Sequence, residues 1–307
     1  MPPPAQRKNS VILNGKGPHF RARIVSGMMV QQQAAAAAFR LLHSGGEILV
    51  LPNAWDVASA RIIEESGFNA VATSSAGVAF SLGYPDGQKI SRDEMLAAIA
   101  RIAKAVRVPV TADVESGYGR TPADAALTAR GVLDAGAVGI NLEDAIGDSN
   151  VALVDLPLQL EKIRAVREIA TRVKIPLVLN ARTDVYLLQI GDPAKRYDET
   201  VRRLSAFRDA GADCVFAPGL RDAATIARLV ADLKCPVNIL AGPGSPSIPE
   251  LSKLGVARVS LGSATMRATM GHLRRIAEEL KTTGTYSKLE DAPSHAEMNQ
   301  MMQRNQL

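Results

Sequence analysis

Acidic residues follow three apolar segments of the chain, and their grouping suits metal-assisted chemistry. Asp113 and Glu115 end one segment (VTADVESGYG), Glu143 and Asp144 end another (GINLEDAIGD), and Asp86 follows a third (SLGYPDG). Carboxylates gathered at one place repel one another unless a positive group lies between them. A hard divalent cation such as Mg²⁺ is a suitable partner, because it takes oxygen ligands and keeps several waters. The pattern therefore predicts metal-assisted chemistry on a small anionic substrate.

The elements that must position these residues alternate regularly along the chain. Apolar segments of strand length precede segments of helical periodicity, many of which end on Gly. We count eight such strand–helix units, which indicates an α/β fold of the (β/α)₈ TIM-barrel type rather than a doubly wound open sheet. The predicted strands are 47–53, 69–75, 108–114, 137–144, 175–183, 212–218, 235–242 and 256–262. The predicted helices are 28–43, 57–67, 91–106, 121–136, 156–172, 192–211, 221–233, 247–255 and 263–284.

Three regions are expected along the chain. Residues 1–27 are polar and lack periodicity, which predicts a disordered or loosely attached tail. Residues 28–285 form the barrel, and residues 286–307 form a C-terminal helical tail. The methionines of that tail could dock on a neighbouring subunit. Alternatively, the terminal helix could fray.

Composition excludes several classes of protein. The 307 residues are 47% hydrophobic, the net charge is +5, and much of the basic excess precedes the barrel. Elsewhere no basic run with interleaved aromatics occurs, so no nucleic-acid partner is expected. No apolar stretch is long enough to span a membrane. Both cysteines, Cys214 and Cys235, fall in or beside predicted strands, which suggests a reducing compartment and a cytoplasmic protein.

In a barrel of this type, the active site is built where the strands end. Asp113 and Glu115 lie two positions apart, so both face one side of a regular strand. Arg182 follows the strand at 175–183, and its guanidinium suits a substrate carboxylate or phosphate. It could instead pair with Asp184 or Glu143. The small residues Ser74, Ser75 and Ala76 could let backbone N–H groups approach an anion.

A second, weaker anion site is indicated at residues 242–245 and 261–263, after the last two predicted strands. The sequence does not support several other kinds of catalytic site. All four histidines lie away from predicted strand ends, which argues against His-ligated zinc and Ser–His–Asp hydrolysis. No GxGxxG follows a strand, and no lysine lies at a strand end for a Schiff base.

Four motifs in order, SSAGVAFSLGYPD, TADVESGYG, GINLEDAIGD and LNARTD, resemble those of the isocitrate lyase/phosphoenolpyruvate mutase superfamily. The resemblance covers roughly residues 45–285. It implies a TIM barrel whose last helix is exchanged between subunits, usually in a homotetramer built from dimers. It also implies Mg²⁺ (or Mn²⁺) and a small α-oxo or α-hydroxy carboxylate as substrate.

The resemblance also assigns roles by position. It implies that Asp113 binds the metal directly, whereas Asp86, Glu115 and Glu143 act through metal-bound water. Ser74, Ser75 and Ala76 would cradle the carboxylate or phosphonate end of the substrate. Arg182 would stabilise the developing oxyanion, and Asn238 would contact the substrate. Tyr118 is our candidate proton donor.

The chain departs from the superfamily pattern at two places. Residues 145–150 read AIGDSN and lack the cysteine and lysine that lyases of isocitrate and methylisocitrate carry there. Residues 217–219 lack a glutamate found in methylisocitrate lyases. Asn150 could match the gating asparagine of phosphonate mutases, although the gate is shortened.

The sequence therefore predicts a Mg²⁺-dependent lyase that cleaves a C–C bond of a small α-oxo or α-hydroxy carboxylate through an enolate. Two alternatives remain open. One is phosphonate chemistry of the phosphoenolpyruvate or carboxyphosphonoenolpyruvate mutase type. The other is a non-catalytic barrel that binds a carboxylate.

Overall fold

A ring of parallel strands forms the centre of the molecule. The computed structural model describes residues 18–44, 46–145 and 153–303. Within these residues the strands are β1 (Leu49–Leu51), β2 (Asn53–Ala54), β3 (Val71–Thr73), β4 (Val110–Asp113), β5 (Gly139–Glu143), β6 (Val178–Arg182), β7 (Cys214–Phe216), β8 (Val237–Leu240) and β9 (Arg258–Ser260). They form one sheet in the order β1-β9-β8-β7-β6-β5-β4-β3-β2, and every pair is parallel.

The sheet closes through its first strand. β1 pairs with β9 and β2 pairs with β3, and only Pro52 separates β1 from β2. Proline lacks a backbone N–H, so it interrupts the strand without redirecting it. Together β1 and β2 act as one strand, and the predicted (β/α)₈ barrel is confirmed.

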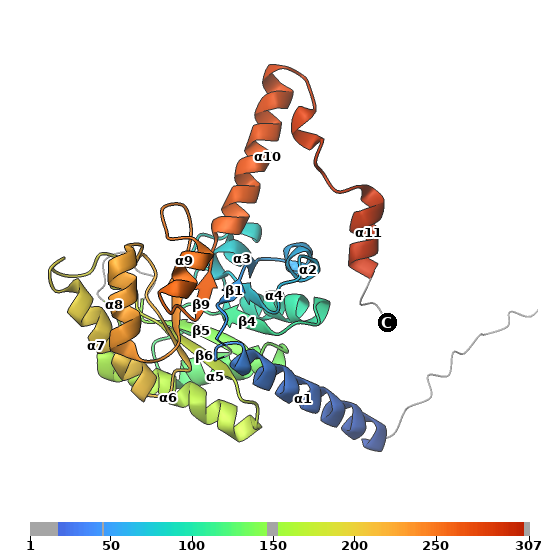
Figure 1. Cartoon of the computed structure of the whole chain (residues 1–307). Coiled ribbons are helices and arrows are strands. Elements are labelled where there is room, and N and C mark those ends of the chain that lie inside the picture. Colours follow the sequence, from blue (N-terminus) through green and yellow to red (C-terminus); the bar gives the residue numbers. More distant parts are fainter. Residues whose placement is uncertain (1–17, 45, 146–152, 304–307) are drawn as a thin grey trace, which may run out of the picture.

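Helices alternate with the strands and surround the barrel (Figure 1). They are α2 (Val57–Glu65), α4 (Arg92–Ala105), α5 (Pro122–Asp134), α6 (Leu156–Val173), α7 (Arg196–Asp209), α8 (Ala223–Leu233) and α9 (Ile248–Lys253). A capping box formed by Ser91 and Glu94 starts α4.

The sequence pattern predicts no helix between the strand at 69–75 and the helix at 91–106, and the structure differs here. Helix α3 (Ser75–Ser81) starts there instead. The Ser74 side chain caps it by accepting a hydrogen bond from the N–H of Gly77 at 3.1 Å. The turn at Ser74 and Ser75 is therefore a strand-to-helix junction, and its conformation is fixed by this cap.

Helix α1 (Pro18–Leu41) begins earlier than residue 28, where the sequence pattern places its start. It lies against the amino-terminal end of the barrel. Gln32 Nε2 donates to the carbonyls of Leu133 and Ala137, just before β5, and the Phe39 side chain is fully buried. This end of the barrel is covered, so a ligand has access from the opposite end, where the strands finish.

Helix α10 (Ala264–Thr282) projects away from the barrel (Figure 1), and Met266 is its one buried side chain. The chain then passes through a 3₁₀ turn, η1 (Ser287–Leu289), and returns as α11 (His295–Gln303). Arg61 on α2 donates to the carbonyl of Met301 on α11. Exchange of the last helix between subunits stays a prediction. Across the described part of the chain, no helix combines the length and apolar character that a membrane span needs.

Gly139 at the start of β5 tests the packing between α1 and the barrel. A Cβ atom there would lie 2.6 Å from Thr111 Oγ1 and 2.7 Å from Phe39 Cε1. We expect Gly139→Ala to lower the free energy of unfolding by about 1–3 kcal/mol, because buried neighbours on both sides must move. Urea unfolding measures this. Gly242→Ala is the matched control, since its Cβ would meet nothing within 4 Å. An equal loss in both variants would contradict the packing described here.

Candidate active site

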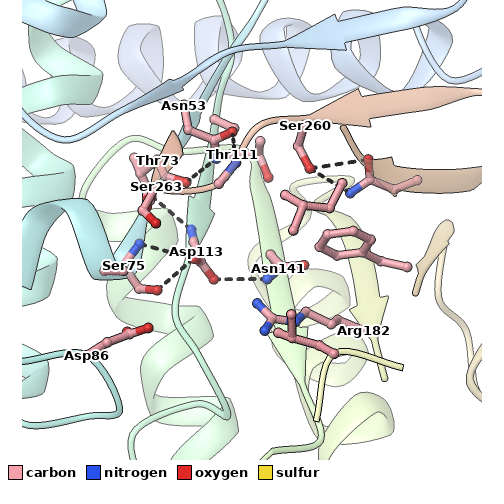
Figure 2. Close-up of a pocket in the computed structure, with 18 of the residues that line it drawn as sticks. Asn53, Thr73, Ser75, Asp86, Thr111, Asp113, Asn141, Arg182, Ser260 and Ser263 are labelled. Carbon is pink, nitrogen blue, oxygen red and sulfur yellow. Dashed lines mark hydrogen bonds between the residues drawn. The ribbon is translucent and has the colours of Figure 1, made fainter. Parts of the chain in front are cut away.

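A cavity of about 230 Å³ opens at the carboxyl ends of the strands. Most of the predicted site residues line it, and Figure 2 shows several of them converging from different strands. The predicted residues in its wall are Ser74, Ser75, Ala76, Asp86, Asp113, Arg182 and Asn238. Glu115, Glu143 and Tyr118 are not in the wall, and of these three Glu143 pairs with the wall residue Arg182.

Asp113, the last residue of β4, is held by its neighbours on both oxygens (Figure 2). Its Oδ2 accepts from the Ser75 N–H at 3.0 Å and from Ser75 Oγ at 2.7 Å. Its Oδ1 accepts from Asn141 Nδ2 at 2.9 Å. A carboxylate oxygen has two lone pairs, so Oδ1 keeps one that no described group uses. The carboxylate is fixed in direction and can still bind a cation.

Arg182, the last residue of β6, is clamped between two carboxylates. Its Nη1 lies 2.8 Å from Glu143 Oε2, and its Nε and Nη2 donate to Asp184 at 2.6 and 3.0 Å. The guanidinium also lies 5.7 Å from the ring centroid of Phe216. Burial lowers the pKa of Arg182, but Glu143 and Asp184 outweigh burial and raise the pKa above its usual value. Arg182 is therefore a fixed positive charge in the cavity wall.

Three further carboxylates, those of Glu115, Asp86 and Glu143, have raised pKa values. Burial first, and then the charges of Asp113 and Asp86, raise the pKa of Glu115 to about 7. Burial and the charge of Asp113 also raise the pKa of Asp86. Burial raises the pKa of Glu143, and Arg182 opposes that rise. Such mutual shifts are typical of a site that binds a cation.

The loop after β4 carries Glu115 and Tyr118, and both adopt positive φ angles, 52° and 55°. The Tyr118 hydroxyl donates to Glu115 Oε1 at 3.4 Å, and burial raises its pKa. Lys162 of α6 is buried and fixes this loop by donating to the carbonyls of Ser116 at 2.6 Å and Gly119 at 3.1 Å. Sequence reasoning missed Lys162, because a lysine in an amphipathic helix is usually exposed.

Asp144 has a structural role, unlike its neighbour Glu143, which pairs with Arg182. It is fully buried and accepts hydrogen bonds from Thr183 Oγ1 at 2.6 Å and the Asp184 N–H at 2.9 Å. It also pairs with Arg203 Nη1 at 3.1 Å. These bonds tie the ends of β5 and β6 together and so hold the segment that carries Asp184 against Arg182.

Several backbone amides of the second anion site that we predicted at residues 242–245 and 261–263 are already engaged. The N–H groups of Leu261 and Gly262 both donate to Asn53 Oδ1 at 2.8 Å. The Gly242 N–H donates to Ser245 Oγ. Cys214 is buried, and burial raises its pKa to about 12, so its thiol is protonated at neutral pH.

Whether this site fits a divalent metal depends on the number of direct ligands. Within the described residues, no three His, Cys, Asp or Glu side chains converge closely enough to hold a metal ion by themselves. Mg²⁺ does not require such a cage, because it usually binds one or two carboxylates and keeps several waters. Asp113 with its open lone pair, flanked by Asp86 and Glu115, fits that mode of binding.

The family model for phosphoenolpyruvate phosphomutase matches residues 39–281 of the chain. The chain belongs to this family. An uncharacterised protein of Mycobacterium tuberculosis is 38% identical over 260 residues, which cover 82% of this chain and 95% of the relative. The crystal structure of a Burkholderia cenocepacia J2315 protein described as a lyase or mutase is 40% identical and superimposes with a TM-score of 0.83, covering 88% of this chain and 96% of that one.

Other relatives carry named activities. Oxaloacetate decarboxylase of Ectopseudomonas mendocina is 30% identical over 76% of this chain and 80% of its own length. Oxaloacetate acetylhydrolase, solved in complex with 3,3-difluorooxalacetate, is 28% identical with a TM-score of 0.77, over 87% of this chain and 93% of that one. Proteins named 2-methylisocitrate lyase also match. The chain is thus an enzyme of the isocitrate lyase/phosphoenolpyruvate mutase superfamily, of the carbon–carbon lyase type.

The segment in which this chain departs from the lyases of isocitrate and methylisocitrate is only partly described. Residues 146–152 lie outside the described residues, and the gating role considered for Asn150 falls among them. The second departure is visible. Ala217 is buried directly after β7, so this strand end brings no carboxylate to the cavity.

Glu115 gives a test of the site's electrostatics. In metal-free protein, its pKa of about 7 lies above the usual 4.5, so its ionisation destabilises the fold as pH rises from 4.5 through 7. The full cost above that range is roughly 3 kcal/mol. We expect Glu115→Gln in EDTA to be more stable than the parent protein at pH 8, with a much smaller gain at pH 5. Urea unfolding at both pH values measures this, and an equal gain at both would contradict the assignment.

Proposed function

We propose that this enzyme uses Mg²⁺ (or Mn²⁺) to cleave a C–C bond of a small α-oxo or α-hydroxy carboxylate. The observation that carries the proposal is the pairing of opposite charges in one cavity. Asp113 has an open carboxylate lone pair, and Arg182 is a fixed guanidinium in the same wall. A metal-binding carboxylate and a cation together suit a substrate that is itself an anionic oxygen chelator.

In this proposal, Asp113 is the direct metal ligand, and Asp86, Glu115 and Glu143 bind metal-held waters. The metal, when bound, would polarise the substrate carbonyl or hydroxyl oxygen. Arg182 would donate hydrogen bonds to the oxygen that becomes negative when the C–C bond breaks and an enolate forms. Because Glu143 and Asp184 hold the guanidinium in place before the reaction, little reorganisation is needed at that step.

Ser74, Ser75 and Ala76 would bind the substrate carboxylate, and Asn238 would contact the rest of the molecule. The Tyr118 hydroxyl would return a proton to the enolate. Its raised pKa keeps it protonated, and its contact with Glu115 gives it a carboxylate from which it can be reprotonated. All of these groups lie on loops and strand ends that the barrel holds at one mouth.

The substrate is expected to be a short oxo acid. The cavity of about 230 Å³ is smaller than the usual pocket for a drug-sized ligand. The relatives named for oxaloacetate support a four-carbon 2-oxo acid as the first candidate. The cleaved bond is then the one that leaves the enolate next to the metal-bound oxygen.

Phosphonate chemistry is the second candidate, and the match to the phosphoenolpyruvate phosphomutase model favours it. The same carboxylates would hold the metal and Arg182 would bind the substrate, and the reacting bond would be P–C in place of C–C. The non-catalytic, carboxylate-binding alternative is not retained, because Arg182 is held by two carboxylates beside Asp113, an arrangement that favours a charged transition state.

We also propose that the enzyme works as a homotetramer in which α10 packs on a neighbouring subunit. Met270, Leu273 and Leu280 on α10 are 42%, 55% and 46% exposed. A projecting helix with apolar residues on one side is stabilised when a partner covers it.

Replacing Arg182 tests the reaction most simply. Purified protein is incubated with Mg²⁺ and a panel of oxaloacetate, 2-methylisocitrate, isocitrate, a 4-hydroxy-2-oxo acid and phosphonopyruvate, and products are identified by NMR with and without EDTA. We expect an EDTA-sensitive C–C cleavage product. Arg182→Lys should lower kcat about 10²–10³-fold, because a lysine cannot form the fork of hydrogen bonds.

Arg182→Ala is expected to be inactive, but it leaves Glu143 and Asp184 without their buried partner and so destabilises the protein. The lysine variant keeps the charge and is therefore the better control of folding, which circular dichroism checks. Near-normal turnover in either folded variant would contradict the role of Arg182.

Light scattering of Leu273→Glu tests the assembly. If α10 packs on a second subunit, a charge at this position should reduce the mass to that of a dimer or monomer. Leu127→Glu is the matched control, because Leu127 is also an exposed helical leucine, 57% exposed, on the barrel helix α5. An unchanged mass for Leu273→Glu would exclude α10 from the interface.

A further inference from the structure

An arginine that sequence reasoning passed over lies inside the barrel. Arg258 is the first residue of β9 and is 2% exposed. Its backbone lies in register between Leu49 of β1 and Asn238 of β8. It lines the same cavity as Asp113 and Arg182. Barrel interiors are usually filled by branched apolar side chains, so a guanidinium at this position needs a physical reason.

Arg258 has no anionic partner within the described residues. Its Nε and Nη1 are buried and form no hydrogen bond there. Two other arginines differ in this respect, since Arg182 pairs with Glu143 and Asp184, and Arg203 pairs with Asp144 and Glu199. Burial lowers the pKa of Arg258, while the charge of Asp113 opposes that change. An unpaired buried guanidinium is unfavourable for folding.

Asp113 does not take the place of that partner. Both of its oxygens are engaged by Ser75 and Asn141, and it forms no ion pair with Arg258. Next to Arg258 on β8, the Asn238 side chain donates to Ser260 Oγ at 3.1 Å. Arg258, Asn238 and Ser260 therefore give the β8–β9 side of the cavity a polar wall with one unpaired positive charge.

Three arginines line the cavity, Arg182, Arg258 and Arg267, and Arg267 is exposed. The other two differ in net charge. Arg182 is neutralised by two carboxylates, whereas the positive charge of Arg258 is free to bind an anion. We propose that Arg258 binds the second carboxylate of a dicarboxylate substrate, whose first carboxylate and adjacent oxygen lie near Asp113 and Arg182. This inference rests on the proposed function and narrows the substrate class from oxo acids in general to di-acids.

Calorimetric binding in Mg²⁺ tests the inference without turnover. The probes are oxalate, which carries only the chelating end, and two longer di-acids, 3,3-difluorooxaloacetate and 2-oxoglutarate. Of the two longer di-acids, the one that binds the parent protein more tightly is compared. We expect Arg258→Met to raise its dissociation constant about 10–100-fold, because a pair of charge-assisted hydrogen bonds is lost. The dissociation constant of oxalate should change less than about threefold, because oxalate does not extend to β9.

The variant is expected to fold, because methionine replaces an unpaired buried charge with an apolar side chain of similar length. Its thermal midpoint should equal or exceed that of the parent protein. Arg258→Lys, which keeps a positive charge, should recover part of the lost affinity for the di-acid. Recovery by lysine distinguishes charge recognition from a purely structural role.

Each remaining outcome has a defined meaning. Equal weakening of oxalate and the di-acid would show that Arg258 supports the site as a whole and would overturn the inference. Unchanged di-acid binding in Arg258→Met, or a parent protein that binds oxalate but neither longer di-acid, would also overturn it while leaving the proposed function intact. A parent protein that binds none of the probes in Mg²⁺ would overturn the proposed function itself.

Discussion

Mutual repulsion among carboxylates governs the mouth of this barrel. Asp86, Asp113 and Glu115 each raise the proton affinity of a neighbour, and burial adds to the effect. The fold offsets the repulsion by surrounding these groups with donors: Ser75 and Asn141 on Asp113, the Gln88 N–H on Glu115, and Arg182 on Glu143. The carboxylate oxygens that these donors do not fully engage are suited to bind a divalent cation. The carboxylate cluster is thus costly for the free protein and favourable for binding.

Residues away from the mouth hold the carboxylate cluster in place. Lys162 fixes the loop that follows β4 by donating to its backbone carbonyls, and Asp144 joins the ends of β5 and β6. α1 covers the opposite end of the barrel, so ligands are confined to the mouth. Arg258 extends the site inward from β9 and adds an uncompensated positive charge to the cavity wall. A site of this kind trades stability of the free protein for affinity.

Much of this architecture follows from the sequence, because buried parallel strands are apolar runs and their helices carry capping residues that mark the boundaries. Asp113 and Arg182 could be located for the same reason, since each ends a strand. The misses have local causes. Ser74 and Ser75 continue the apolar strand pattern, but the Ser74 side chain caps a helix, so the pattern does not indicate α3. Arg258 stands within an apolar run, and only the strand register shows that it lines the cavity. Bonds between distant residues, such as Lys162 to the β4 loop, leave no trace in sequence spacing.

A crystal structure with Mg²⁺ and oxalate would test the central claim most directly. The account predicts one metal ion bonded to a single protein oxygen, from Asp113, with Asp86, Glu115 and Glu143 hydrogen-bonded to its waters. Oxalate would complete the coordination within reach of Arg182. A metal bonded directly to three or more side chains, or bound away from Asp113, would contradict the account.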